Sequence, residues 1–348
     1  MNKKALTDEA NALQGCLADR RTMTGRRKNP VPEDETLVLP RPFQPDEAKL
    51  LSSKAFRLLR KKTQVTTRPD NPYIRTRDTH VLEVVAVSVI ASEMLGLNTS
   101  LVRAIAIGHD IGHVPLGHQG EKFMAEAMGC SHFCHEVMAP LIAQRVERKG
   151  VGLNLTFEVL EGMMCHSGEK AYDGMTQEAW VVRYTDKLAY IFADYNDLVV
   201  RMGYPACKEL REIMDEFGHN QRRRTTTALA GLIIESAEHG RVSFQHSEVA
   251  KKFARLRELM YEIYGRVTLQ NTENIMRPVL DFLTELKICN PFLMLALMTD
   301  DDVLRLAQTP MLNLGHLKDT ALSEVLPHLE AISPIGEPLD LCNPYLNW

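Results

Sequence analysis

Apolar residues in this chain recur at helical spacing between residues that start or end helices, and this pattern constrains the fold more than any other feature. Asp46 can cap one such segment. Thr79 precedes another, residues 80–95, which ends at Gly96. Further helical segments are expected at 100–108, 118–128, 132–149, 157–166, 176–202, 222–239, 247–265, 267–287 and 312–330. Strand-like runs are confined to 151–155 and 240–244, so the sequence predicts an all-α fold.

The pattern also suggests three regions. Residues 1–45 carry scattered charges and a series of prolines, which predicts a flexible, extended N-terminal arm. Residues 46–205 form the expected catalytic core. Residues 206–348 are expected to be a helical extension packed on that core.

Composition narrows the class of protein. The 348 residues have a formal net charge of −4, so general nucleic-acid binding is not indicated. The first fifteen residues lack the apolar run of a signal peptide, and the apolar run 81–91 is too short to span a bilayer. Seven cysteines without a CxxC pair favour a reducing compartment. A cytoplasmic protein with no membrane partner is expected.

Polar residues interrupt the apolar pattern at three places. His109 and Asp110 lie together in the run AIAIGHDIGHVPLGH, while His80 and Asp186 each flank a long apolar segment. Hydrogen-bonded core residues would explain any one of these four, and a lone His-Asp pair is a weak signal. Together they offer imidazole and carboxylate ligands to one divalent ion and leave positions open for water and substrate.

A second polar group follows in the sequence. His118 and Glu121 are three residues apart, so they can share a helix face and hydrogen-bond. A carboxylate that orients an imidazole makes an acid/base pair suited to neutral pH, and His113 lies close by in sequence. His135 and His166 could add charge to the same cleft.

Cations lie next to the expected ligands. Arg75 and Arg77 precede His80, and Lys187 follows Asp186. Arginine side chains suit phosphate oxygens, although exposed salt bridges would also explain each cation taken singly.

Five segments in order resemble the HD superfamily, and within it the dGTPase-like branch of dNTP triphosphohydrolases. They are KKTQV, RTRDTHVLEV, HDIGHVPLGHQGE, LTFEVLEGMMCH and TDKLAYIFAD. The resemblance covers about residues 50–200. The His-Asp pair occurs in many phosphohydrolases, whereas the longer GHDIGHxPxGHxGE run is specific to this branch.

The resemblance implies a role for each matching residue. Metal ligands would be His80, His109, Asp110 and Asp186, holding Mn²⁺, Mg²⁺ or a similar ion. His118 would be the catalytic imidazole, oriented by Glu121. The residues implied to contact substrate are Arg77 and Lys187 at the phosphates, His113 and His135 near them, Gln64 and Asp194 at the sugar 3′-hydroxyl, and Tyr190 under the deoxyribose.

Two positions depart from the pattern of the resembled family. Glu136 follows His135 where bacterial members usually have Asn, and Leu116 stands where Phe is usual. These departures leave the expected metal chemistry intact but weaken any expectation about the base, including a preference for dGTP.

The function expected is hydrolysis of dNTPs to deoxynucleoside and inorganic triphosphate. One alternative is another HD phosphohydrolase, such as a 5′-nucleotidase or a cyclic-nucleotide phosphodiesterase. A second alternative is a nucleotide-sensing or nucleic-acid-binding regulator, which the basic N-terminal residues and the run 222–224 would support. Those same residues could form an allosteric dNTP site between subunits. Apolar faces in the C-terminal helices, with the resemblance, favour a homo-oligomer.

Overall fold

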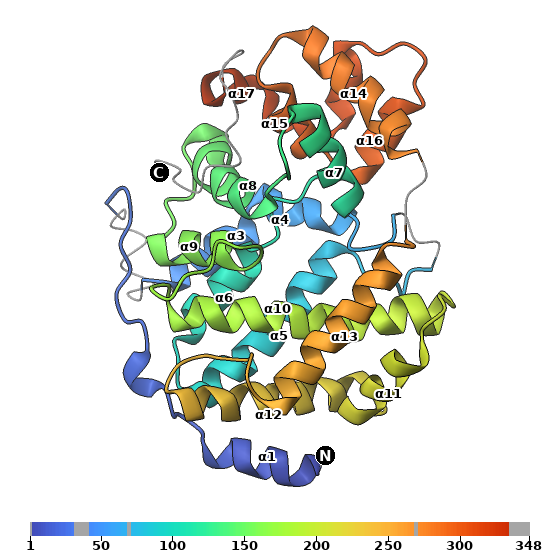
Figure 1. The fold of residues 1–348 in the computed structure, drawn as a ribbon. Helices are drawn as coiled ribbons and strands as arrows, with labels where there is room; N and C mark the ends of the chain where they lie inside the picture. The colour runs from blue at the N-terminus through green and yellow to red at the C-terminus, as the bar shows by residue number, and fades with distance from the viewer. Residues whose placement is uncertain (1, 31–41, 68–70, 268–270, 334–348) are drawn as a thin grey trace.

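The computed structural model describes residues 2–30, 42–67, 71–267 and 271–333, in which the regular elements are helices (Figure 1). Two isolated β-bridges, Arg27 with Thr156 and Thr63 with Thr76, are the strand-like pairings found within these ranges. The prediction of an all-α fold is therefore confirmed. The runs 151–155 and 240–244, expected as strand candidates, are loops that lead into the following helices.

Three central helices pack on one another: α5 (Arg77–Leu95), α6 (Thr99–Gly108) and α10 (Gln177–Asp194). The helices around them are α1 (Lys3–Ala12), α3 (Gln44–Ser52), α4 (Lys54–Leu58), α7 (Gly117–Met128), α8 (His135–Leu141), α9 (Phe157–Cys165), α11 (Lys208–Phe217), α12 (Gln221–His239) and α13 (Glu248–Tyr264). The last group comprises α14 (Thr272–Leu286), α15 (Pro291–Ala296), α16 (Asp300–Ala307) and α17 (Leu326–Ile332). In Figure 1 this group lies with α7 above the central helices, and α1 lies below α12.

Short 3₁₀ and π segments complete the helical elements. The 3₁₀ turns are Ala18–Arg20, Leu59–Lys61, Arg148–Gly150, Leu314–Asp319 and Ala321–Glu324. The π segments are Ile142–Val146 and Tyr195–Arg201, which continue α8 and α10. The helix expected over 132–149 is thus divided, and Pro140, which has no backbone N–H, precedes the π segment. The helix expected over 312–330 is likewise divided into two 3₁₀ turns and α17. Helices α1, α11, α15 and α16 were not predicted.

Two expected caps differ in the structure. α5 begins at Arg77, and Thr79 lies inside its first turn, although Gly96 ends the helix as predicted. Asp46 lies inside α3 instead of capping it. Its buried carboxylate accepts hydrogen bonds from the backbone N–H and hydroxyl of Thr156, at 2.9 and 2.8 Å, and pairs with Arg27. Tertiary hydrogen bonds have therefore replaced the local cap.

The N-terminal residues that the structure describes are not an extended arm. α1 packs on α12, and the backbone N–H of Thr22 donates to the buried carboxylate of Glu178 at 3.0 Å. Arg27 donates to the backbone oxygen of Asn154 at 2.6 Å. These long-range contacts, which local sequence patterns do not reveal, hold the N-terminal residues against the core. The prolines at 32 and 40 lie outside the described residues. No described helix is both long enough and apolar enough to cross a bilayer.

Candidate functional site

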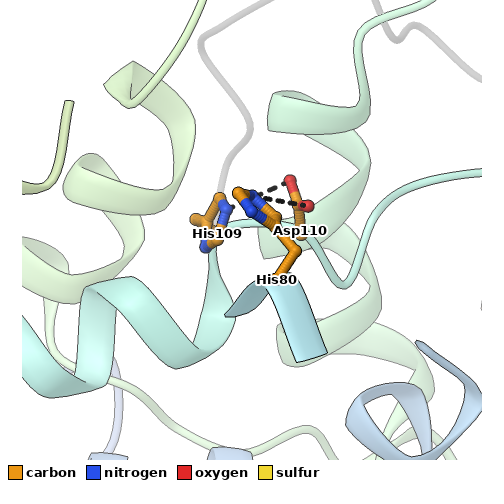
Figure 2. A group of neighbouring side chains, drawn as sticks. All are labelled: His80, His109 and Asp110. Carbon is orange, nitrogen blue, oxygen red and sulfur yellow. Dashed lines mark ion pairs between the residues drawn. The ribbon is translucent and has the colours of Figure 1, made fainter. Parts of the chain in front are cut away.

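Four residues of the type that binds metals meet where the three central helices approach one another, and Figure 2 shows three of them, His80, His109 and Asp110. His80 projects from α5, His109 and Asp110 follow the end of α6, and Asp186 lies on α10. Nε2 of His80 is 3.2 Å from Oδ1 of Asp186 and 3.7 Å from Oδ2 of Asp110. Nε2 of His109 is 3.3 Å from Oδ1 of Asp110 and 3.8 Å from Oδ1 of Asp186. All four side chains are buried.

The charges and lone pairs of this cluster fit a divalent cation. Nδ1 of His109 lies 2.7 Å from the backbone oxygen of Ala106, and burial lowers the pKa of the imidazole. The neutral ring then donates through Nδ1, so its buried Nε2 carries a lone pair that has no hydrogen-bond partner in the described protein. Burial alone would raise the pKa of Asp110, but His109 and Arg77 hold it well below its usual range. Imidazole and carboxylate ligands around an unpaired nitrogen suit a divalent cation.

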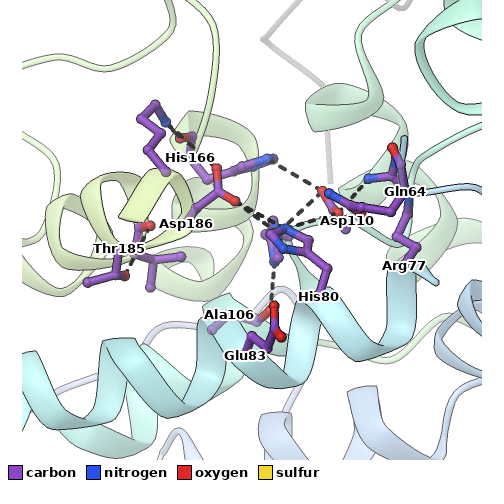
Figure 3. A network of polar contacts seen from close by, with 12 residues as sticks. Gln64, Arg77, His80, Glu83, Ala106, Asp110, His166, Thr185 and Asp186 are labelled. Atoms are coloured by element: carbon purple, nitrogen blue, oxygen red, sulfur yellow. Dashed lines mark hydrogen bonds and ion pairs between the residues drawn. The ribbon is translucent and has the colours of Figure 1, made fainter. Parts of the chain in front are cut away.

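The cluster continues through hydrogen bonds to the residues around it (Figure 3). Nη1 of Arg77 donates to Oδ2 of Asp110 at 2.7 Å, and Nη2 lies 3.4 Å from the backbone oxygen of Gln64. The amide oxygen Oε1 of Gln64 is buried and has no partner among the described residues. Arg77 therefore connects the Gln64 loop to a candidate metal ligand, and Gln64 retains an acceptor for another molecule.

A second group of ionisable residues surrounds Glu121 on α7. Its Oε1 is 2.7 Å from Nδ1 of His113 and 2.9 Å from Nδ1 of His135, and its Oε2 is 3.1 Å from Nδ1 of His118. The His113 and His135 rings stack with their centroids 3.7 Å apart. The side chain of His118 is 71% exposed, whereas those of His113 and His135 are almost fully buried. One carboxylate therefore lies within 3.1 Å of three imidazoles and is hydrogen-bonded to that of His118, the one accessible to solvent.

The protonation of these rings follows from their surroundings. Burial opposes the charged form of His135, but Glu136 and Glu121 raise its pKa to about 9. Burial lowers the pKa of His166 to about 3, and its Nδ1 donates to the backbone oxygen of Met163 at 2.7 Å. Nε2 of His135 can then donate to Nε2 of His166, 3.3 Å away. At neutral pH His135 is the cation of this pair.

Two glycines allow the close approach that assembles this group. A Cβ atom on Gly112 would lie 2.1 Å from the backbone oxygen of His135, so the turn after α6 can rest directly on the start of α8. A Cβ on Gly120 would lie 1.8 Å from the backbone oxygen of Pro115. Glycine at these positions brings His113 against His135.

A cavity of about 290 Å³ connects the two groups of residues. The predicted site residues that line it are Gln64, Arg77, His80, Asp110, His113, His118, His135, Asp186, Lys187, Tyr190 and Asp194. His109 and Glu121 lie behind this lining and contact it through Asp110 and His113. Lys187 donates to the backbone oxygens of His166 and Arg183, at 3.1 and 2.8 Å. The structure thus brings most of the predicted residues to one cavity.

Arg75 is the predicted substrate contact that the structure places elsewhere. Its buried guanidinium contacts Asp194, Glu83 at 2.6 Å and Asp197 at 3.0 Å, and it does not line the cavity. Asp194 also accepts a hydrogen bond from the hydroxyl of Tyr264 at 2.7 Å. Arg75 is therefore bound to carboxylates behind the cavity wall, where it supports Asp194.

Sequence reasoning missed cavity residues that follow α10 and others that come from the C-terminal region. Tyr204 lines the cavity after α10, and Tyr261, Tyr264 and Val267 line it at the end of α13. Tyr261 and Tyr264 are three apart on a helix that the sequence did predict. That spacing was the available signal, but it could not show which helix face meets the core.

Sequence comparison relates this chain to known proteins. The family model of the HD domain matches residues 77–191. The chain is 34% identical over 231 residues to a deoxyguanosinetriphosphate triphosphohydrolase-like protein of Clostridium tetani, covering 65% of this chain and 66% of that one. It is 33% identical over 265 residues to the protein of the same name from Caldanaerobacter subterraneus, covering 75% and 76%. A third, from Cereibacter sphaeroides, is 46% identical over 131 residues, covering 36% and 35%.

Proposed function

Because this chain belongs to the family of deoxyguanosinetriphosphate triphosphohydrolase-like proteins, we propose that it hydrolyses deoxynucleoside triphosphates to deoxynucleoside and inorganic triphosphate. Water would attack the α-phosphorus, the bond to the 5′-oxygen would break, and that oxygen would gain a proton. The observation that carries the proposal is one cavity with a candidate metal cluster on one wall and an exposed imidazole on another.

His80, His109, Asp110 and Asp186 would hold the divalent ion of this reaction. When bound, such an ion supplies Lewis-acid polarisation of a phosphate oxygen. The residues themselves contribute the negative charge and the neutral imidazole nitrogen that retain the ion. Arg77 holds Asp110 in place through the 2.7 Å hydrogen bond.

His118 is the proposed proton-transfer group. Glu121 fixes its Nδ1 at 3.1 Å, and this leaves Nε2 free to exchange a proton with the leaving 5′-oxygen or with the attacking water. Burial would raise the pKa of Glu121, but His113 and His135 hold it well below its usual range, so the carboxylate remains charged. An anionic partner stabilises the imidazolium that forms when His118 accepts a proton.

The remaining residues of the cavity suit a triphosphate and a deoxyribose. The His135 cation and Lys187 place positive charge within it. Burial lowers the pKa of Lys187 to about 8, which leaves the amine mostly charged at neutral pH. The 3′-hydroxyl can donate its one hydrogen bond to the unpaired Oε1 of Gln64 or to the carboxylate of Asp194. Tyr190 would pack beneath the sugar.

Product analysis tests the proposal. The full chain is incubated with Mn²⁺ or Mg²⁺ and each dNTP, singly and in mixtures, and the products are separated by ion-exchange chromatography. Deoxynucleoside with triphosphate is the expected result. Turnover in mixtures alone would add an activating nucleotide to the scheme. Monophosphate with pyrophosphate, or no turnover of any dNTP by metal-loaded protein, would overturn it.

A further inference from the structure

The carboxylate of Asp300 joins two neighbouring segments that contribute Gln64 and Leu116 to the lining of the cavity. Asp300 is the first residue of α16 and is 4% exposed. Its Oδ1 accepts a hydrogen bond from the backbone N–H of Leu116 at 2.8 Å. Its Oδ2 accepts hydrogen bonds from the backbone N–H of Thr63, at 2.9 Å, and from the Thr63 hydroxyl. One side chain from the C-terminal helices thus binds two separate parts of the core.

The first of these parts leads to the metal cluster. The backbone oxygen of Thr63 accepts hydrogen bonds from Nε and Nη2 of Arg77, at 3.1 and 2.9 Å. Arg77 in turn donates to Asp110. Thr63 also precedes Gln64, whose amide faces the cavity. A shift of Thr63 would therefore move both Gln64 and the guanidinium that orients a candidate metal ligand.

The second part leads to the proposed proton-transfer group. Leu116 has φ 63°, a left-handed conformation that is uncommon for a residue with a branched side chain. It directly precedes α7, which carries His118 and Glu121. The hydrogen bond from Asp300 secures this backbone at the point where the direction of α7 is set.

Asp300 has no role in capping its own helix. The capping box of α16 is completed by Thr299 and Asp302, which exchange hydrogen bonds between side chain and backbone. A second contact strengthens the connection: Nζ of the buried Lys62 donates to the backbone oxygens of His113 and, at 3.0 Å, Ala296. The end of α15 and the start of α16 therefore contact this part of the core, and the buried carboxylate of Asp300 is directed at Thr63 and Leu116.

We propose that Asp300 is a positioning residue, which sets the distance between the Gln64 loop and the start of α7 and thereby aligns His118 with the metal cluster. This inference rests on the proposed function above. It also assigns the C-terminal helices a part in the geometry of the reaction. Misplacement of a reacting group by about 1 Å can cost on the order of 100-fold in rate.

The test compares Asp300→Asn with Asp302→Asn in the full chain with Mn²⁺. Both side chains are buried on α16 and accept backbone N–H bonds, but Asp302 contacts Thr299 and Ala321, away from the cavity. We expect Asp300→Asn to increase amide hydrogen exchange in 62–67 and 113–118 and to lower kcat about 100-fold, while Mn²⁺ still binds. Asp302→Asn is expected to lower Tm about as much as Asp300→Asn does, while its kcat stays within about twofold of the wild-type value.

The outcomes separate this inference from the proposed function. If both variants lower kcat in proportion to Tm, or if exchange in the two segments stays at the wild-type level, the positioning role is wrong. If the wild type hydrolyses no dNTP, the proposed function fails, while the exchange data still decide whether Asp300 holds the segments. Should Asp300→Asn not fold, Thr63→Val removes one of the three donors and is expected to show a smaller effect in the same direction.

Discussion

Nδ1 of His118 lies 3.1 Å from Oε2 of Glu121, and this hydrogen bond holds an exposed imidazole at the rim of a cavity whose other histidines are buried. His118→Ala is therefore expected to lower kcat on dNTPs by about 10²- to 10⁴-fold, since the proton-transfer group is lost. Mn²⁺ binding, measured by calorimetry, should persist because His118 is outside the metal cluster. His132→Ala removes another exposed histidine and should retain activity. Full activity of His118→Ala would exclude the assigned role.

Removal of a candidate ligand should abolish metal binding. Wild-type protein at a Mn²⁺ concentration 100 times Kd should gain about 2.7 kcal/mol of stability from the bound ion. Asp186→Asn removes a carboxylate that lies 3.2 Å from Nε2 of His80, so its Tm is expected not to respond to Mn²⁺. Thermal unfolding with and without the ion measures this difference. A wild-type-like rise in Tm for Asp186→Asn would place the ion elsewhere. The control is His239→Ala, because His239 is exposed and far from the cluster in sequence.

Arg75 was expected to contact substrate, but its buried ion pairs predict that it stabilises the fold instead. Arg75→Leu would leave the carboxylate of Asp194 buried without its cation, and breaking a buried pair in this way costs roughly 3–5 kcal/mol. Arg201 also pairs with Asp197 but is 43% exposed, so Arg201→Ala should cost about 0–1 kcal/mol. Urea unfolding of both variants gives the comparison. Equal losses of unfolding free energy would show that burial does not determine how much these ion pairs stabilise the protein.

The sequence predicted the helical class and most of the cavity because both depend on local patterns. Apolar spacing locates α5, α6 and α10, and polar residues within those apolar stretches identify His80, Asp110 and Asp186. What it could not predict depends on contacts between distant segments. The capping function expected of Asp46 is replaced by bonds to Thr156, 110 residues away. The division of the chain at residues 45 and 205 remains a prediction.

The same limit applies to the residues that complete the site. Arg75 and Arg77 are two positions apart and look alike in the sequence, yet one is bound to Asp194 and the other to Asp110. Their separation follows from the start of α5 at Arg77, which places Arg75 in the preceding loop. Asp300, 184 residues from Leu116, carries no local signal at all.

Glu235 of α12 should make stability depend on pH in the acidic range. Its buried carboxylate accepts hydrogen bonds from three backbone N–H groups, those of residues 245, 246 and 247, and from the hydroxyls of Ser243 and Ser247. Burial opposes the charge, but these bonds lower the pKa of Glu235 from 4.5 to about 2. The folded state therefore binds this proton less readily than the unfolded state does, and the stabilisation is complete above about pH 4.5 and is lost as pH falls toward 2.

Glu235→Gln removes that charge, so the variant should lose about 3 kcal/mol of unfolding free energy at pH 7, and its deficit should shrink as pH falls from about 4.5 toward 2. Chemical unfolding of wild type and variant between pH 3 and pH 7 measures the difference, with Glu238→Gln on the exposed side of the same helix as control. The sign of the pH dependence distinguishes two cases. A carboxylate buried without these hydrogen bonds would have a raised pKa, and its replacement by Gln would cost the least unfolding free energy at neutral pH. A deficit that grows as the solution is acidified would mean that the three N–H groups are not bound to an ionised Glu235.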